Sequence, residues 1–201
     1  MRIERRQLDD LAAESGFRPE TLEKVIRLGD LAHASIKVIG LEELCAGKIC
    51  ALLSRVASRD LFDATLLPEI VGDAWMGRRL RRIIVAFSAI LDHPLNRYGR
   101  DRLERVTNQE ITRQLIPMLQ QDGSVSAPEL RSRAWKAIEP IFDLEPEEQE
   151  FVTLVQQGEL RPELLFGEDD ELTTRFRRHP ALLWKAANAR RFSSRPTPGS
   201  D

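Results

Sequence analysis

Apolar residues recur with helical spacing along most of the chain. Within residues 73–91, Leu80, Ile83, Ile84 and Phe87 follow one another at intervals of three, one and three, which predicts a helix with one buried face. Similar patterns, bounded by proline and glycine, predict further helices at residues 41–55, 109–119, 128–138, 146–157 and 179–191. Residues 36–39 (Ile-Lys-Val-Ile) are the only segment that favours a β-strand. The pattern therefore predicts a mainly α protein.

The composition is that of an ordinary soluble globular protein. The 201 residues include 30 Lys and Arg and 32 Asp and Glu, for a formal net charge of −2, and 42% are hydrophobic. These values exclude collagen-like and wholly disordered chains, and they argue against a protein dedicated to coating nucleic acid. The longest uncharged apolar run, residues 83–91, is too short to cross a bilayer. Because Cys45 and Cys50 lie five residues apart in a predicted helix, we expect no disulfide between them and a cytoplasmic location.

Charged residues are unevenly spread. Residues 143–171 are mostly acidic, whereas residues 175–195 and the arginines between Arg78 and Arg105 are basic. One interpretation is that these are solvated helix faces that pair with the acidic stretch. The other is a surface that faces RNA or a triphosphate. Few aromatic residues interleave with the arginines, which argues against stacking on single-stranded RNA.

The segment from Lys48 to Asp63 carries the strongest candidate chemistry. Lys48 is the only charge between Glu43 and Arg55, in a helix apolar enough to be buried on most sides, so its ammonium needs a partner anion or a wet pocket. At about 100° per residue, Arg55 and Arg59 fall about 20° to either side of Lys48 and Asp63 about 60° away, if the helix continues. Such a stripe could hold a polyphosphate.

A structural interpretation of the same residues carries equal weight. In it, Arg55, Arg59, Asp60 and Asp63 form a capping and salt-bridge cluster at a junction between two helices, with Asp60 capping the second. Other signals are weak. The three histidines are far apart without metal-ligand spacing, no glycine-rich phosphate loop occurs, and the three tryptophans are expected to anchor the core.

The sequence IKVIGLEELCAGKICALLSRVASRDLFDATLL resembles the third signature block of the AbiEii/AbiGii nucleotidyltransferase toxins, which runs strand, E-L-x-x-x-K, helix, R-x-x-x-R-D-L-x-D. The opening segment RRQLDDLAAESGFRPETLEKVIRL and the closing segment that contains HPALLWK are similar to the family's ends. The resemblance implies an α/β core like that of DNA polymerase β-type enzymes. It implies a toxin of a toxin–antitoxin or phage-defence pair that moves a nucleotide from a nucleoside triphosphate (NTP), with Mg²⁺, onto an RNA acceptor such as tRNA.

The resemblance also implies site residues. Lys48 and Asp60 match the family's late catalytic positions, and Arg55, Arg59 and Asp63 match the flanking signature that binds the nucleotide. The implied partners are a cognate antitoxin protein and the RNA acceptor, with no membrane.

One departure from the family changes the expected activity. The family's first block is a G-[GS]-[ST] turn followed by D-x-D, whose carboxylates hold the metal, and no such block occurs in this chain. We therefore expect no metal ligands, and no nucleotide transfer by this chain alone. A non-catalytic helical module that binds an antitoxin or RNA is the alternative.

The expected architecture follows from this departure. Residues 1–34 are predicted to be an N-terminal helical segment, and residues 35–72 a remnant of the nucleotidyltransferase core, with one short strand and a helix. Residues 73–192 are predicted to form a helical C-terminal domain, and residues 193–201 a disordered tail.

Overall fold

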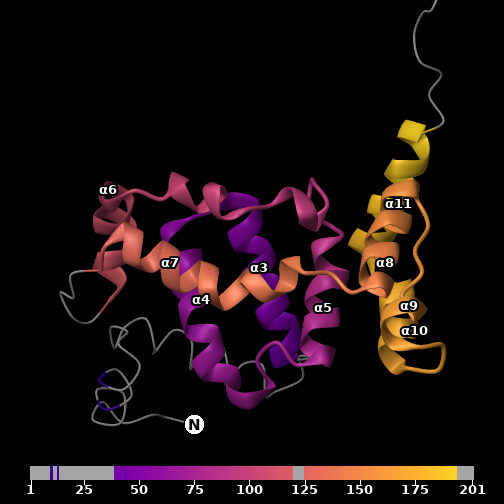
Figure 1. The fold of residues 1–201 in the computed structure, drawn as a ribbon, viewed down its shortest axis with the longest axis horizontal. Helices are drawn as coiled ribbons and strands as arrows, with labels where there is room; N and C mark the ends of the chain where they lie inside the picture. The colour runs from indigo at the N-terminus through magenta and orange to yellow at the C-terminus, as the bar shows by residue number, and fades with distance from the viewer. Residues whose placement is uncertain (1–9, 11–12, 14–38, 120–124, 194–201) are drawn as a thin grey trace, which may run out of the picture.

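The computed structural model describes residues 10, 13, 39–119 and 125–193, with side chains up to Arg191. This part of the chain is mainly helical, as predicted, and contains no β-strand (Figure 1). The predicted strand at residues 36–39 finds no support. Only Ile39 of that segment is described, and it lies in neither a strand nor a helix. Most of the predicted N-terminal segment, and the tail from residue 194, lie outside the described residues.

Helix α3 (Leu41–Arg55) has the bounds that the pattern predicts, and it buries Cys45, Ile49 and Leu52 among others. It ends at Val56, which adopts φ 55° and ψ 54° and donates its N–H to the Leu52 carbonyl at 3.1 Å. This left-handed conformation costs a β-branched residue about 1–2 kcal/mol. The turn is short, because helix α4 (Ser58–Val71) begins only three residues after α3 ends.

Helices α5 (Arg78–Ser88) and α7 (Ala127–Ile138) complete the packing around this pair. Helix α3 packs against α4 and α5, and α4 packs against α7. Residues 73–91 do not form one helix as predicted. A 3₁₀ turn, η1 (Gly72–Ala74), precedes α5, and Met76 with φ 59° separates the two. The predicted buried face of α5 is confirmed by Leu80, Ile83 and Ile84.

A run of short turns connects α5 to α7 and lies along one side of α3 and α4 (Figure 1). The run consists of η2 (Leu95–Arg97), η3 (Arg100–Arg105), α6 (Asn108–Glu110), the π-helical η4 (Ile111–Leu115) and η5 (Ile116–Met118). The predicted helix at residues 109–119 is thus divided into three short pieces, the last of which contains Pro117. Buried Leu103, Val106 and Ile111 attach the run to the core.

The C-terminal helices gather at one end of the molecule (Figure 1). After η6 (Glu139–Phe142) come α8 (Pro146–Gln157), α9 (Glu163–Phe166), α10 (Glu171–Arg177) and α11 (Pro180–Ser193). Helix α8 begins with a capping box between Glu145 and Glu148 and ends at Gly158. Gly158 has φ 90°, and a Cβ there would collide with Arg190, so only glycine fits. Helix α8 packs against α11 and α5.

Buried hydrophobic side chains form one cluster from α3 to α11. Trp75 and Trp135 pack against it as expected, but Trp184 is 66% exposed, so its predicted core role is wrong. Helix α11 buries Leu182 and Ala186, and Trp184 lies on its other side. The predicted domain boundary between residues 72 and 73 stays a prediction. None of the described helices is long and apolar enough to cross a membrane.

Candidate functional site

The five predicted site residues lie on α3 and on the first half of α4. Lys48 and Arg55 belong to α3, and Arg59, Asp60 and Asp63 belong to α4. Because only Val56 and Ala57 separate the two helices, the structure brings four of the five side chains into two ion pairs. We call the five residues the signature cluster.

Lys48 is paired but is not buried. Its Nζ lies 2.5 Å from Oδ2 of Asp63, and the two side chains are 42% and 24% exposed. The expectation of a buried ammonium is therefore wrong. The described residues leave one side of α3 open, since Leu44, one turn before Lys48, is also half exposed.

Arg55 and Asp60 form an ion pair with two hydrogen bonds. Nε and Nη2 of Arg55 donate to the two carboxylate oxygens of Asp60, each at 2.7 Å. The Asp60 side chain is only 2% exposed. Its hydrogen bonds and charge raise the pKa of Arg55. Asp60 is not the cap of α4, because Ala57 occupies that position and Asp60 is the third residue of the helix. At this position a carboxylate opposes the positive end of the helix dipole.

Arg59 is exposed and has no ion pair among the residues that the structure describes. The predicted continuous stripe does not form, because the helix breaks at Val56 and starts again at Ser58. The Arg55–Asp60 pair fits the salt-bridge interpretation, but Asp63 pairs with Lys48, which that interpretation did not include. The signature cluster carries three cations and two carboxylates, so one positive charge remains, at Arg59.

Two residues that the sequence analysis missed hold this junction in place. An Oε1 atom of Glu110 accepts a hydrogen bond at 2.9 Å from the N–H of Ser58, the first residue of α4, which lacks a side-chain cap of its own. Arg102 donates to the Ser54 carbonyl at 2.9 Å and stacks over the Tyr98 ring at 4.8 Å. Glu110 and Arg102 lie about 50 residues after the groups that they bond, so no local sequence pattern reveals these contacts.

The described residues do not fit a metal ion. No group of three or more His, Cys, Asp or Glu side chains that could hold one occurs among them. The two carboxylates of the signature cluster each face a cation at 2.5–2.7 Å. Both cysteines are free, as expected, and burial raises the pKa of the Cys50 thiol to about 12, so that thiol is no ready metal ligand. Lys48 and Arg55 are already in ion pairs, so a triphosphate would compete with Asp63 and Asp60 for their charges.

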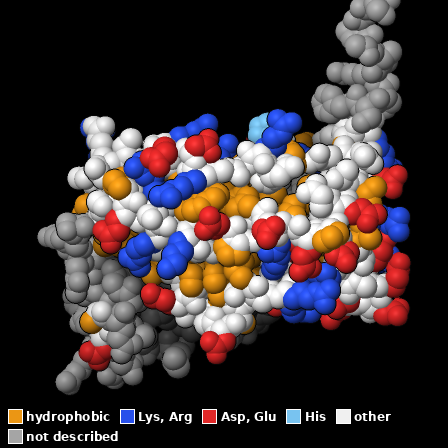
Figure 2. All heavy atoms as spheres, in the orientation of Figure 1, with side chains coloured by type: hydrophobic (Ala, Val, Ile, Leu, Met, Phe, Trp, Pro, Cys, Tyr) orange, Lys and Arg blue, Asp and Glu red, His pale blue; other side chains and the backbone are white. Residues whose placement is uncertain are grey.

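The basic stretches divide between the two interpretations. Arg81 and Arg82 pair with Glu148 and Glu145 of the acidic stretch, as the first interpretation expects, but Arg81 and Arg82 are only 14% and 11% exposed, so these faces are not solvated. Other exposed arginines have no ion pair within the described part of the chain: Arg78, Arg97, Arg100 and Arg105. On the face in Figure 2, cationic and anionic side chains alternate around a central group of hydrophobic ones.

Comparison with known proteins places the chain in a family. The sequence model of the AbiEii nucleotidyl transferase toxins of type IV toxin–antitoxin systems matches residues 5–156, which are 152 of the 201 residues. The matched range contains the whole signature cluster and ends in α8, so the similarity noted for the closing segment lies beyond it. Neither the curated proteins nor the solved structures gave a match. The chain belongs to the family of AbiEii nucleotidyl transferase toxins of type IV toxin–antitoxin systems.

Proposed function

We propose that this chain acts in a toxin–antitoxin or phage-defence system but does not transfer nucleotides by itself. The family implies transfer from an NTP, with Mg²⁺, to an RNA acceptor such as tRNA, in the cytoplasm and under the control of a cognate antitoxin. Lys48 and Asp60 occupy the family's late catalytic positions, with Arg55, Arg59 and Asp63 on the nucleotide-binding flank. The first block, with its metal-binding carboxylates, is absent from the sequence.

The two ion pairs of the signature cluster are the observation that carries this proposal. Asp60 is almost fully buried and accepts two hydrogen bonds from Arg55, so it is neither a free base nor a free metal ligand. The charge of Lys48 is paired with that of Asp63. An NTP carries three to four negative charges and normally arrives with a metal. Of the cations in this cluster, only Arg59 has no ion pair to another described residue.

The test uses the full chain with labelled NTPs, Mg²⁺ or Mn²⁺, and total tRNA. We expect no label in RNA above the level of the Lys48→Ala variant. Lys136→Ala is the matched control, because Lys136 is exposed on α7 and has no ion pair among the described residues. Label that Lys136→Ala retains and Lys48→Ala loses contradicts the proposal.

A second candidate function is the binding of RNA or an antitoxin without catalysis. It is favoured by Arg97, Arg100 and Arg105, which are exposed and have no ion pair within the described residues. They lie close together in sequence, on the run of short turns whose Arg102 donates a hydrogen bond to the end of α3. Cations close together neutralise phosphates, and each neutralised phosphate steepens the salt dependence of binding by about 0.7–0.9 in log units, as measured for single-stranded and duplex DNA.

Filter binding of tRNA at several salt concentrations tests this second function. We expect binding without NTP or metal, and a shallower salt slope, by about 2, for the Arg100→Ala/Arg105→Ala double variant. Arg81→Ala is not a suitable control, because Arg81 pairs with the buried Glu148. Arg133→Ala is suitable, because Arg133 on α7 is exposed. The absence of tRNA binding, or equal salt slopes for the double variant and Arg133→Ala, excludes RNA binding by these arginines. Binding of an antitoxin is then the remaining non-catalytic function.

A further inference from the structure

Helix α11 exposes apolar side chains along one face. Leu183 and Trp184 are 48% and 66% exposed, and Pro180 and Ala187 are exposed as well. These four residues follow the spacing i, i+3, i+4 and i+7, which makes them neighbours on one side of an α-helix. We call them the α11 face. They form a continuous apolar strip along the first two turns of the helix.

The position of α11 keeps this face away from the core that the described residues form. Leu182 and Ala186 are buried, and α11 packs against α8. The last turns of α11 reach beyond the other described helices in Figure 1. The α11 face also lies beyond residues 5–156, the range that the family model matches. Contiguous exposed apolar surface that contains a tryptophan is typical of a contact with another molecule.

The charges of this helix are all positive. Helix α11 contains Lys185, Arg190 and Arg191 but no Asp or Glu, and Arg178 comes just before it. Lys185 donates to the carbonyl of Leu91 at 2.7 Å rather than to a carboxylate. Arg178 and Arg191 are exposed and have no ion pair to another described residue. An apolar strip with cations at both ends is complementary to a partner that carries apolar side chains and carboxylates.

We propose that the α11 face is a docking site for an acidic amphipathic helix of a partner protein. The helical spacing of its apolar residues presents a ridge against which a second helix can pack its own apolar stripe. Carboxylates of the partner then meet Arg178 at one end of the strip and Arg191 beyond the other. Trp184 is the expected anchor, because tryptophan and arginine often dominate the free energy of such interfaces. The inference is independent of nucleotide transfer.

Two other occupants fit the α11 face less well. A second copy of this chain that docked through the same face would bring the same cations, and like charges repel. Single-stranded nucleic acid binds on rows of aromatic side chains, whereas Trp184 is the only aromatic residue of the α11 face. The charge and the aliphatic neighbours therefore favour an acidic protein helix.

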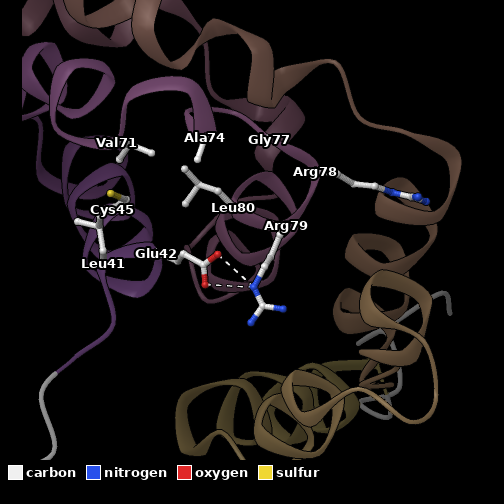
Figure 3. A pocket seen from close by; sticks show the side chains of 9 residues that line it. All are labelled: Leu41, Glu42, Cys45, Val71, Ala74, Gly77, Arg78, Arg79 and Leu80. Carbon is white, nitrogen blue, oxygen red and sulfur yellow. Dashed lines mark hydrogen bonds and ion pairs between the residues drawn. The ribbon is translucent and has the colours of Figure 1, made fainter.

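The pocket where α3, the end of α4 and the start of α5 meet supplies a matched control (Figure 3). It has a volume of about 350 Å³, and Leu41 lines it. The ion pair between Glu42 and Arg79 lies at its edge, so the rim carries both signs of charge and favours neither. Leu41 and Leu183 are both 48% exposed. Leu41→Glu and Leu183→Glu therefore make the same change at two separate places.

Fluorescence anisotropy of two labelled peptides with the full chain tests the proposal. Both peptides are helices of about 20 residues with the same leucine stripe, and their polar positions carry either glutamate or lysine. We expect the glutamate peptide to bind and the lysine peptide not to bind. Leu183→Glu and Trp184→Ala should each weaken binding of the glutamate peptide roughly tenfold, whereas Leu41→Glu should weaken it less than about twofold. All three positions are exposed, so the variants should fold.

Several results overturn the proposal. They include no binding of the glutamate peptide, equal binding of the two peptides, and equal losses in Leu183→Glu and Leu41→Glu. Binding of a labelled single-stranded oligouridine that Trp184→Ala abolishes also overturns it, because the α11 face is then a nucleic-acid site. Sedimentation that shows a concentration-dependent dimer, lost in Leu183→Glu, overturns it as well, because a second copy then occupies the face.

Discussion

The ammonium of Lys48 lies 2.5 Å from the carboxylate of Asp63, fifteen residues later on the next helix. The charge of Lys48 is therefore paired with a carboxylate of the same chain. The ion pair also predicts what happens when the charge of Lys48 is removed. Both side chains are partly exposed, so water screens the pair and its contribution to stability is modest.

Lys48→Met should lower the free energy of unfolding by roughly 1 kcal/mol, because Asp63 loses its partner while it keeps some access to water. Asp63→Asn should have a similar effect, and the double variant should cost less than the sum of the two. Chemical denaturation of the four proteins measures this. An increase in stability on Lys48→Met would mean that the lysine is an unpaired relic, contrary to the structure.

Arg55 and Arg59 form a natural comparison. Arg55→Ala leaves the buried Asp60 carboxylate without its two hydrogen bonds and should destabilise the protein by roughly 2–3 kcal/mol. Arg55→Lys should recover only part of this, because lysine cannot donate from two fixed positions. Arg59→Ala should change stability by less than about 0.5 kcal/mol, since Arg59 is exposed and unpaired within the described part. Similar losses for Arg55→Ala and Arg59→Ala in thermal or chemical denaturation would refute the assigned roles.

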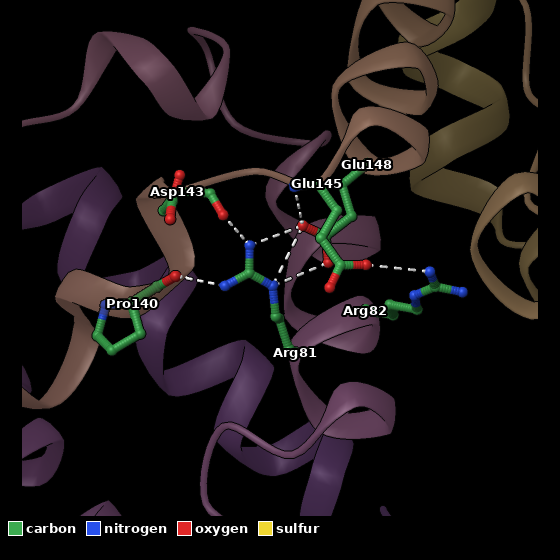
Figure 4. Close-up of polar contacts among 6 residues, drawn as sticks. All are labelled: Arg81, Arg82, Pro140, Asp143, Glu145 and Glu148. Carbon is green, nitrogen blue, oxygen red and sulfur yellow. Dashed lines mark hydrogen bonds and ion pairs between the residues drawn. The ribbon is translucent and has the colours of Figure 1, made fainter.

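Arg81 fastens α5 to the C-terminal helices. It donates to Glu148, whose side chain is fully buried, and to the carbonyls of Pro140 and Asp143 (Figure 4). Arg81→Met should cost about 3–5 kcal/mol because it leaves a buried carboxylate unpaired. Arg79→Met removes an exposed pair with Glu42 and should cost less than about 1 kcal/mol. Urea denaturation of both variants checks the contrast, and equal midpoints would contradict it.

His179 gives the fold a pH dependence. Its ring packs against those of Phe87 and Phe176, at centroid distances of 5.3 Å and 6.3 Å, and its Nδ1 is buried with no hydrogen-bond partner in the described structure. Burial lowers the pKa of His179 below 6.5, while Glu43 raises it and Arg175 lowers it by smaller amounts. Because the unfolded chain binds a proton more readily, stability should be unaffected above about pH 6.5 and fall as the pH drops from there to the lowered pKa.

The pH effect can be assigned to His179 with two variants. His179→Phe should remove this part of the pH dependence, whereas His93→Gln should keep it, because His93 is exposed. Thermal unfolding between pH 5 and pH 8 provides the measurement. If the two variants keep the same slope as the unmodified chain, another group is responsible.

Local patterns predicted much of the fold. The bounds of α3 and the end of α8 at Gly158 follow from residues within a few positions of each other. Such features depend on local sterics and hydrogen bonds, which the sequence contains in full. The exposed Trp184 and the divided helix before α7 depend on which face packs against which helix, and periodicity alone does not reveal this.

The sequence predicted that the residues of the signature cluster lie close together, but not how they pair; their role as site residues stays a prediction. Spacing placed Lys48, Arg55 and Asp63 near one another, but it assumed that one helix continues through Val56. The left-handed turn at Val56 changes the direction of the chain, so Arg55 reaches Asp60 and Lys48 reaches Asp63. Glu110, which caps α4 from a distant segment, has no signal in the sequence of the site.

Direct binding of an NTP to the full chain tests the central claim, that the signature cluster is closed by its own ion pairs. Titration calorimetry with each NTP, with and without Mg²⁺, should show no metal-dependent binding in the unmodified chain. The variant Asp63→Asn frees Lys48, and Asp60→Asn weakens the hold on Arg55, so these two variants should bind a triphosphate more tightly than the unmodified chain. Metal-dependent binding by the unmodified chain that Lys48→Ala and Asp60→Asn both abolish would contradict the account.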